Sequence, residues 1–199
     1  MHADVAPIID GKTLDAVWQQ APVIADFTQF DPGENLPPTF RTEARVAYDT
    51  RNLYVLVRAF DPHPDSLVAL LSRRDVKSPS DQLKIIIDGY QDGRSGVEMA
   101  INPAGVQRDY AIYSDAVEDA TWDGVWEAAA RVDSAGWVAE FRVPLSQLRF
   151  SAKDDNNFGF GIWRDIARLN ERSAWPAYRP SQRTLISQLG TLTGLTGLG

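Results

Sequence analysis

The chain contains no cysteine and only two histidines, His2 and His63. The lack of cysteine excludes disulfide bonds, thiol catalysis, iron–sulfur clusters and cysteine-ligated zinc. Two histidines are also too few for a multi-histidine zinc site, and a Ser-His-Asp triad would have to use one of them. His63 lies between two prolines and His2 lies next to the N-terminus. Neither context is typical of a catalytic base.

Long apolar runs and excess positive charge are absent as well. No run approaches the roughly 18 apolar residues that a membrane-spanning helix needs. The first residues, Met-His-Ala-Asp, lack the apolar segment of a signal peptide, so we expect a chain from which a signal peptide has been removed. The formal net charge is -7, which argues against a broad phosphate-binding surface. We therefore expect no nucleic-acid partner.

The 199 residues have the composition of a folded domain, with 44% hydrophobic and 24% charged residues. Apolar and polar residues alternate with a period of two in many short segments, which predicts β-strands. These segments span residues 43–48, 53–60, 83–87, 96–102, 107–113, 126–132, 137–143 and 158–166. Helical patterns are short and are confined to residues 14–20, 65–71 and 144–148.

This pattern predicts a single all-β domain over residues 1–190. We expect a two-sheet antiparallel β-sandwich, jelly-roll or immunoglobulin-like, with a few short helices. Residues 191–199 contain mainly glycine, leucine and threonine and no charge. We expect them to form a flexible tail and to be a candidate junction to a missing C-terminal region.

A series of short motifs, in a characteristic order, covers roughly residues 8 to 190. The motifs are Ile9–Trp18, Tyr48-Asp49, Asn52–Val55, Ser80-Asp81, Asn102–Gly105, Trp122–Ala128, Gly136-Trp137, Phe141–Pro144 and Leu148–Phe150. In these motifs the chain resembles the family 9 carbohydrate-binding modules, in the version found at the N-terminus of large bacterial outer-membrane proteins. The resemblance implies a jelly-roll-like sandwich that binds saccharide ends, often with structural calcium. It also implies a periplasmic or outer-membrane-associated location and a C-terminal membrane barrel as partner.

Trp122 and Trp126 are the leading candidates for a saccharide platform, because they flank a glycine in an acidic loop. Aromatic faces pack well against the C–H groups of a pyranose ring. The alternative for Trp126 is a core position, since it also begins a predicted strand. Trp18 and Trp137 are expected in the core.

Four polar residues complete the candidate ligand site. Arg73 and Arg74 carry forked guanidinium groups that suit vicinal hydroxyls, and Asn102 and Gln107 flank the Pro-Ala-Gly turn. The alternative for the arginines is a structural ion pair in a loop. The alternative for Asn102 is a turn that caps its own backbone.

Asp115, Asp119 and Asp123 are candidate calcium ligands. With Glu118 they place four carboxylates within nine residues, and calcium prefers oxygen ligands. The spacing is not that of an EF-hand, and a solvated acidic loop is the alternative. Asp10 and Asp15 form a second, weaker calcium candidate.

Three functions follow from these patterns. The leading hypothesis is a non-catalytic, periplasmic carbohydrate-binding module that binds a saccharide or polysaccharide at an aromatic and arginine-lined face. The first alternative is a structural accessory domain of an outer-membrane barrel protein with no small ligand. It is favoured because the resemblance implies a tryptophan shortly before Asp81, whereas residues 75–79 contain no aromatic side chain. The third is a polysaccharide hydrolase, but no two carboxylates stand out as an acid and base pair, so we do not expect an enzyme.

Overall fold

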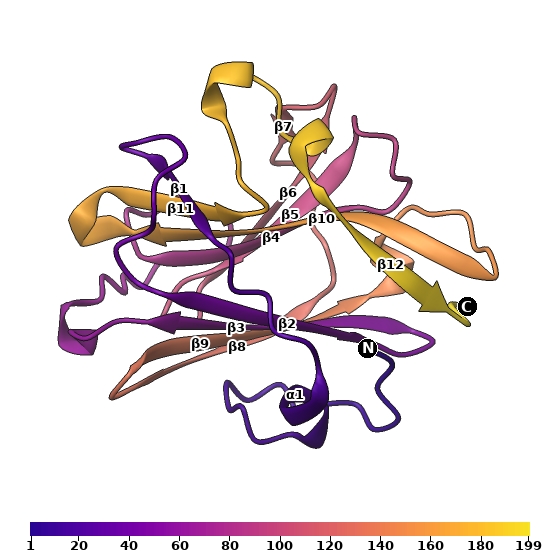
Figure 1. Cartoon of the computed structure of the whole chain (residues 1–199), viewed down its shortest axis with the longest axis horizontal. Helices are drawn as coiled ribbons and strands as arrows, with labels where there is room; N and C mark the ends of the chain where they lie inside the picture. Colours follow the sequence, from indigo (N-terminus) through magenta and orange to yellow (C-terminus); the bar gives the residue numbers. More distant parts are fainter.

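Two antiparallel sheets pack face to face in the computed structural model, which describes residues 1–199 (Figure 1). The smaller sheet contains, in order, β2 (Thr42–Tyr48), β3 (Asn52–Phe60), β9 (Gly136–Pro144) and β8 (Glu127–Asp133). The larger contains β1 (Thr28–Asp31), β11 (Glu171–Trp175), β10 (Asp155–Ile166), β4 (Gln82–Asp88), β5 (Gly96–Ile101), β6 (Gln107–Tyr113) and β7 (Val117–Asp119), and β12 (Gly190–Thr196) also pairs with β10. The predicted β-sandwich is confirmed.

The main core lies between the sheets and consists of the inward-facing residues of both. Leu83, Ile85 and Ile87 of β4 face Trp137 and Phe141 of β9 across this layer, and all five side chains are fully buried. Successive side chains of a strand point to opposite faces, so alternation in sequence becomes two distinct faces in space. Trp137 therefore lies in the core as predicted.

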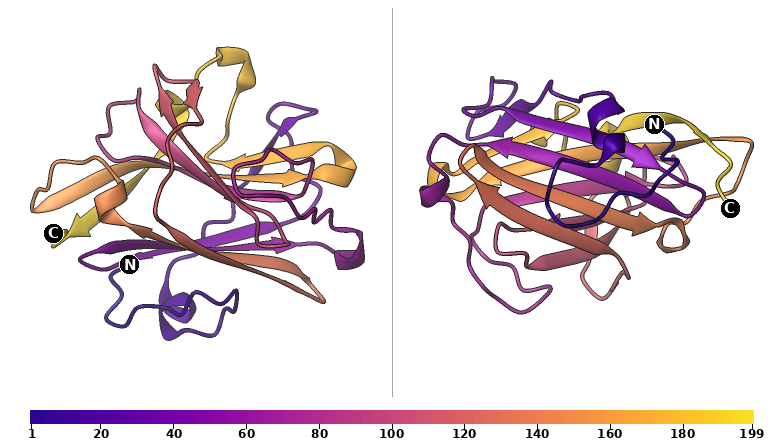
Figure 2. Two further views of the ribbon diagram at one scale, coloured as in Figure 1. Left: turned by 180° about the vertical axis from the view of Figure 1, so that it is seen from behind. Right: turned by 90° about the horizontal axis from the view of Figure 1, so that it is seen from below.

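A second apolar layer covers the outer face of the smaller sheet. The N-terminal segment and α1 (Ala16–Gln20) lie across this face (Figure 2). Val17 and Trp18 pack there against Tyr54 and Leu56 of β3 and Val138 of β9. Because β3 is covered on both faces, it is almost continuously apolar in sequence.

The short helices differ in part from the expectation. The turn at 144–148 forms η2 (Leu145–Gln147), but residues 65–71 form only η1 (Pro64–Ser66). After η1 the chain is extended, and the Asp81 amide donates to the Val68 carbonyl oxygen. The other single-turn helices are η3 (Ala167–Leu169), η4 (Pro180–Gln182) and η5 (Ile186–Gln188). None of the helices has the length and apolar character needed to cross a membrane.

The C-terminal residues correct the expectation of a flexible tail over 191–199. Most of them belong to β12, which pairs antiparallel with β10. Leu195 and Leu198 are buried in the main core, and the Tyr48 hydroxyl donates to the Gly194 carbonyl oxygen at 3.0 Å. These two leucines and the free edge of β10 therefore hold the segment against the sandwich.

Candidate ligand-binding site

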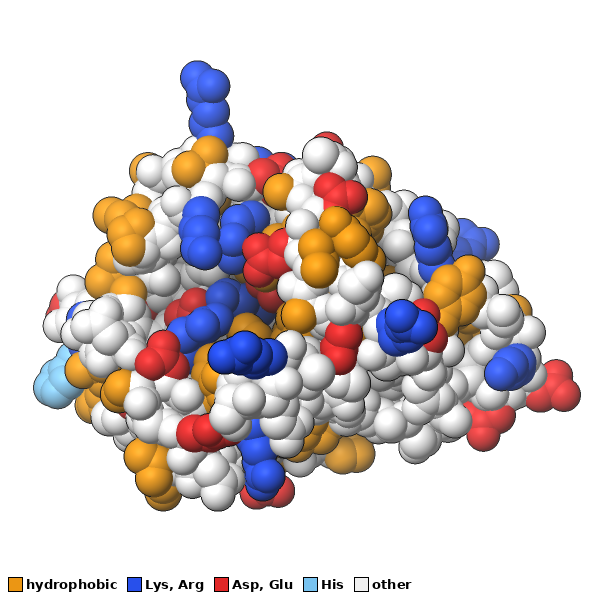
Figure 3. All heavy atoms as spheres, turned by 90° about the horizontal axis from the view of Figure 1, so that it is seen from above, with side chains coloured by type: hydrophobic (Ala, Val, Ile, Leu, Met, Phe, Trp, Pro, Cys, Tyr) orange, Lys and Arg blue, Asp and Glu red, His pale blue; other side chains and the backbone are white.

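A cleft of about 830 Å³ lies on the outer face of the larger sheet. β10, β4, β5 and β6 form its floor, and residues around 77–80 and 178–185 form parts of its rim. Figure 3 shows this face of the molecule, hollowed and with basic and acidic side chains gathered inside the hollow. The cleft has the size of a small-molecule site.

Three aromatic side chains form one wall of the cleft. The ring centroids of Phe30 and Trp163 lie 5.0 Å apart, and that of Tyr178 lies 4.8 Å from Trp163 and 5.0 Å from Phe30. The Arg172 guanidinium lies over this cluster, 5.0 Å from the Phe30 centroid and 5.3 Å from that of Trp163. Mutual packing and the cation–π contacts hold the wall in place.

Strand register brings charged residues together on the floor. Lys84 of β4 pairs with Trp163 of β10, so both side chains point to the outer face. The Lys84 ammonium lies 2.8 Å from a carboxylate oxygen of Asp165, two residues further along β10. On the other side, β5 and β6 contribute Glu98 and Arg108.

Glu98 is the most unusual residue of this floor. Its side chain is only 1% exposed, yet neither carboxylate oxygen accepts a hydrogen bond of normal length, and the nearest neutral donor is the hydroxyl of Tyr110, the residue paired with it on β6. The nearest cation is the guanidinium of Arg108, at 3.8 Å, and the Nε of Arg108 also lacks a partner. Burial raises the pKa of the Glu98 carboxyl. An unpartnered buried carboxylate is costly, so the floor holds acceptors and a donor that a polar ligand could use.

The predicted platform residue Trp126 lies in the main core, which was the alternative for it. It is 7% exposed, stacks on Phe141 and donates from its indole nitrogen to a carboxylate oxygen of Asp109 at 2.6 Å. A ligand-binding role for Trp126 stays a prediction that this burial does not support. Trp122 is half-buried and lines a second cavity, away from the cleft.

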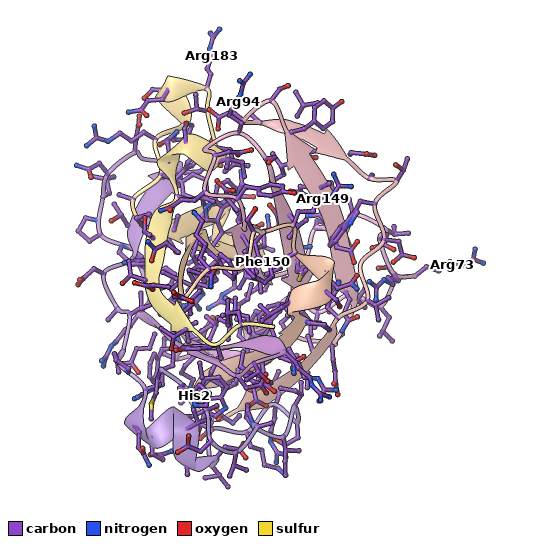
Figure 4. All side chains as sticks on the ribbon, turned by 90° about the vertical axis from the view of Figure 1, so that its right-hand side faces the viewer. His2, Arg73, Arg94, Arg149, Phe150 and Arg183 are labelled. Atoms are coloured by element: carbon purple, nitrogen blue, oxygen red, sulfur yellow. The ribbon has the colours of Figure 1, made fainter.

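Arg74 and Arg73 occupy contrasting positions. Arg74 donates to the side chains of Gln107 at 2.9 Å and Asp109 at 2.5 Å and to the Gly124 carbonyl oxygen at 2.9 Å. These bonds use it as a structural link between loops. Arg73 is exposed and extends away from the body of the protein (Figure 4).

Asn102 and Gln107 make local contacts outside the cleft. The side-chain Oδ1 of Asn102 accepts from the amides of Ala104 and Val106, at 3.0 and 2.9 Å, so Asn102 caps its own turn. Gln107 accepts from Arg74. A ligand-binding role for these residues stays a prediction: neither lines the cleft, although the Asn102 side-chain amide donates to the hydroxyl of Ser80 on its rim at 3.4 Å.

The three predicted calcium ligands are engaged separately. Asp115 accepts from the amides of Leu185 and Ser187, Asp119 accepts from Thr121, and Asp123 lies 3.4 Å from Arg74. No three histidine, cysteine or acidic residues are grouped so that they could hold a metal ion. Calcium binding stays a prediction that this arrangement does not support.

The sequence patterns missed the cleft residues, although a signal existed. Lys84 and Glu98 each interrupt an apolar strand with a charge. A charged residue that replaces an apolar one in a buried strand indicates either a hydrogen-bond or ion-pair partner inside the protein or a ligand-binding site. The same interruption occurs at Arg164, which instead donates to the carbonyl oxygens of Arg41 and Phe60.

Comparisons with known proteins agree with this architecture. Residues 9–175 match the family model described as carbohydrate family 9 binding domain-like. No curated protein matches the chain. A family 9 carbohydrate-binding module from Caldicellulosiruptor kristjanssonii in complex with cellotriose has a TM-score of 0.69, 17% identity, and coverage of 98% of this chain and 92% of that chain. Its complex with glucose gives a TM-score of 0.69, 16% identity, and coverage of 97% and 94%. With the family model matched over most of its length, the chain belongs to the carbohydrate family 9 binding domain-like family.

Proposed function

We propose that this protein is a non-catalytic binding module that holds a saccharide in the cleft on the outer face of the larger sheet. The observation that carries the proposal is the buried Glu98 carboxylate, which lines the cleft and accepts no hydrogen bond of normal length, its polar neighbours being the Tyr110 hydroxyl and the Arg108 guanidinium. Buried polar groups in folded proteins are nearly always hydrogen-bonded. Sugar hydroxyls would supply the missing donors.

The rest of the cleft provides what a saccharide needs. The half-buried Tyr178 ring offers aromatic surface for the C–H face of a pyranose, and the buried rings of Phe30 and Trp163 support it from behind. Arg108 offers an unpartnered Nε donor next to the Glu98 acceptor. An acceptor and a charged donor side by side can bind two neighbouring hydroxyls of one sugar ring.

The similar structures support a neutral saccharide as the ligand. They were solved with cellotriose and with glucose, neither of which carries a charge. We also propose a periplasmic or outer-membrane-associated location and a membrane barrel as partner, and these two proposals rest on the sequence resemblance alone.

The rim gives some support to a second function, an accessory domain of a membrane barrel without a small ligand. Residues 77–80 line the cleft with Lys, Ser, Pro and Ser, so this part of the rim carries no aromatic side chain. A titration with saccharides separates the two functions. Failure of every saccharide to bind would favour the accessory domain.

The test is a tryptophan-fluorescence titration of the full chain with glucose, cellotriose and a panel of other neutral saccharides. We expect a saturable change that is weakened by roughly tenfold or more in Glu98→Gln, because a charged hydrogen bond is lost. Glu127→Gln is the matched control, since Glu127 is exposed on the smaller sheet. A folded protein that responds to no saccharide, or a Glu98→Gln variant that binds like the wild type, would overturn the proposal.

A further inference from the structure

A second cavity, of about 480 Å³, opens at the side of the sandwich. It lies beyond the ends of β4, β5 and β6, next to the turn that contains η2. Apolar side chains of these strands and of that turn line its inner part: Ile87, Val97, Ala111, Ile112 and Leu148. None of its lining residues lines the cleft, so the two sites are separate.

Three aromatic side chains surround this cavity. Tyr90 is 53% exposed and Tyr113 is 51% exposed, while Trp122 is half-buried. Three partly exposed aromatic residues around one hollow form an exposed apolar patch, and patches rich in aromatic residues mark binding sites. Their rings offer flat apolar surface with polar hydroxyl and indole groups at the edge.

The Trp122 ring is positioned by a glycine. A Cβ atom on Gly124 would lie 2.5 Å from the end of the Trp122 ring, so only glycine allows the ring to lie against this backbone. The Gly124 carbonyl oxygen accepts from Arg74, and its amide donates to Asp109 at 3.3 Å. The Arg74–Asp109 link is therefore a positioning element for the loop that carries Trp122.

Polar groups of both kinds line the same cavity. Arg149, which follows η2 (Figure 4), is exposed and belongs to none of the ion pairs of the protein. The Gln147 carbonyl oxygen accepts from the Val125 amide at 3.0 Å, which leaves the NH₂ group of that side chain as a donor. Asp119 supplies acceptor oxygens and is bonded only within its own turn, to Thr121.

We infer that this cavity is a second saccharide-binding site, which takes one neutral pyranose residue. The ring would pack on Trp122, while Arg149 and Gln147 donate to hydroxyls and Asp119 accepts from one. One cation and one anion line the cavity, so its charge favours a neutral sugar over a uronic acid. The site does not depend on the cleft, because the two share no residue.

The test is an NMR titration of the ¹⁵N-labelled full chain with glucose, with cellotriose and with glucuronate. We expect glucose or cellotriose to produce saturable amide shifts at residues 89–97, 111–122 and 147–149. The shifts should persist in Glu98→Gln, which separates this site from the cleft. Arg149→Ala and Tyr113→Ala, both at exposed positions, should each raise the Kd obtained from this set of shifts by roughly fivefold.

Arg51→Ala is the matched control, because Arg51 is an exposed arginine in the β2–β3 turn and lines neither site. Absence of saturable shifts in this region with both neutral sugars would overturn the inference. So would unchanged affinity in Arg149→Ala and Tyr113→Ala, or tighter binding of glucuronate than of glucose. Loss of the cleft shifts alone would count against the proposed function and leave this inference standing.

Discussion

Two buried glutamates, one on the outer face of each sheet, have opposite surroundings. Glu140 of β9 is fully buried and accepts hydrogen bonds from the amides of Asp10 and Gly11, at 2.9 and 2.6 Å, and from the indole of Trp18 at 2.8 Å. Glu98 of β5 is equally buried but accepts no hydrogen bond of normal length, with only the Tyr110 hydroxyl and, at 3.8 Å, the Arg108 guanidinium as neighbouring donors. Burial raises the pKa of both carboxyls.

The difference explains why one face is closed and the other open. Glu140 fixes the N-terminal segment and the Trp18 ring over the smaller sheet, and its three donors compensate much of its desolvation. On the larger sheet no backbone amide or indole donates to Glu98 as they do to Glu140, its neighbouring donors come from β6 of the sheet itself, and that face remains a cleft. The same residue type thus anchors structure in one sheet and remains available to a ligand in the other.

The largest effect is expected from Glu140→Ala. Removing the carboxylate leaves two buried donors and one partly buried donor without an acceptor, so we expect the free energy of unfolding to fall by about 3 kcal/mol, since each orphaned buried donor costs ~1–3 kcal/mol. Urea unfolding measures the change. Glu127→Ala, at an exposed position, should change stability by much less, and equal losses in the two variants would remove the structural role assigned to Glu140.

The opposite sign is expected from Glu98→Gln. The amide has nearly the same shape but carries no charge, so its burial costs less, and we expect stability at neutral pH to rise by about 1 kcal/mol. Saccharide affinity should fall in the same variant. A clear loss of stability would show that Glu98 has a structural partner, and the contrast with Glu140 would then disappear.

The pH dependence of stability sharpens this contrast. Because burial raises the pKa of Glu98 in the folded protein, this glutamate ionises first in the unfolded chain as the pH rises past its ordinary pKa of about 4.5. The Glu98 contribution to stability therefore falls as the pH rises through this value and up to the folded pKa. The stability difference between Glu98→Gln and the wild type should be small below pH 4.5 and should grow above it. Unfolding curves measured from pH 4 to pH 8 would check this, and a difference independent of pH would contradict it.

The smallest effect is expected from Arg172→Ala at the aromatic wall. The guanidinium lies over Phe30 and Trp163 but is partly exposed, so we expect stability to fall by less than about 1 kcal/mol. Saccharide affinity should weaken a few-fold, because the wall is held less firmly. Fluorescence titration of this variant beside Arg51→Ala measures the difference, and identical affinities would remove the wall from the proposed site.

Most of the strands could be predicted because their burial pattern is local. β3 and β9 are long, regular and apolar, and the predicted ranges 53–60 and 137–143 nearly coincide with them. β1, β7, β11 and β12 were not predicted. They are short or weakly patterned, and β11 and β12 form because they pair with an edge or a free segment of β10. Such pairing depends on a strand that is distant in sequence.

The candidate sites were harder to predict for the same reason. Trp126 and Arg74 have the residue types of a sugar site, but the fold turns them toward Asp109 and uses them inside the protein. Lys84, Glu98 and Trp163 come from three different strands, and only strand pairing brings them to one floor.

The sequence by itself determined the class of fold, because alternating apolar residues with turns between them can bury their surface only as packed sheets. The order of its motifs, from residue 9 to residue 150, also indicated the family, which the family model matches over residues 9–175. Only the tertiary structure decided which polar residues face a ligand. Whether a side chain faces a cleft, the core or a hydrogen-bond partner depends on which strands lie beside its own, as Glu98 and Glu140 show.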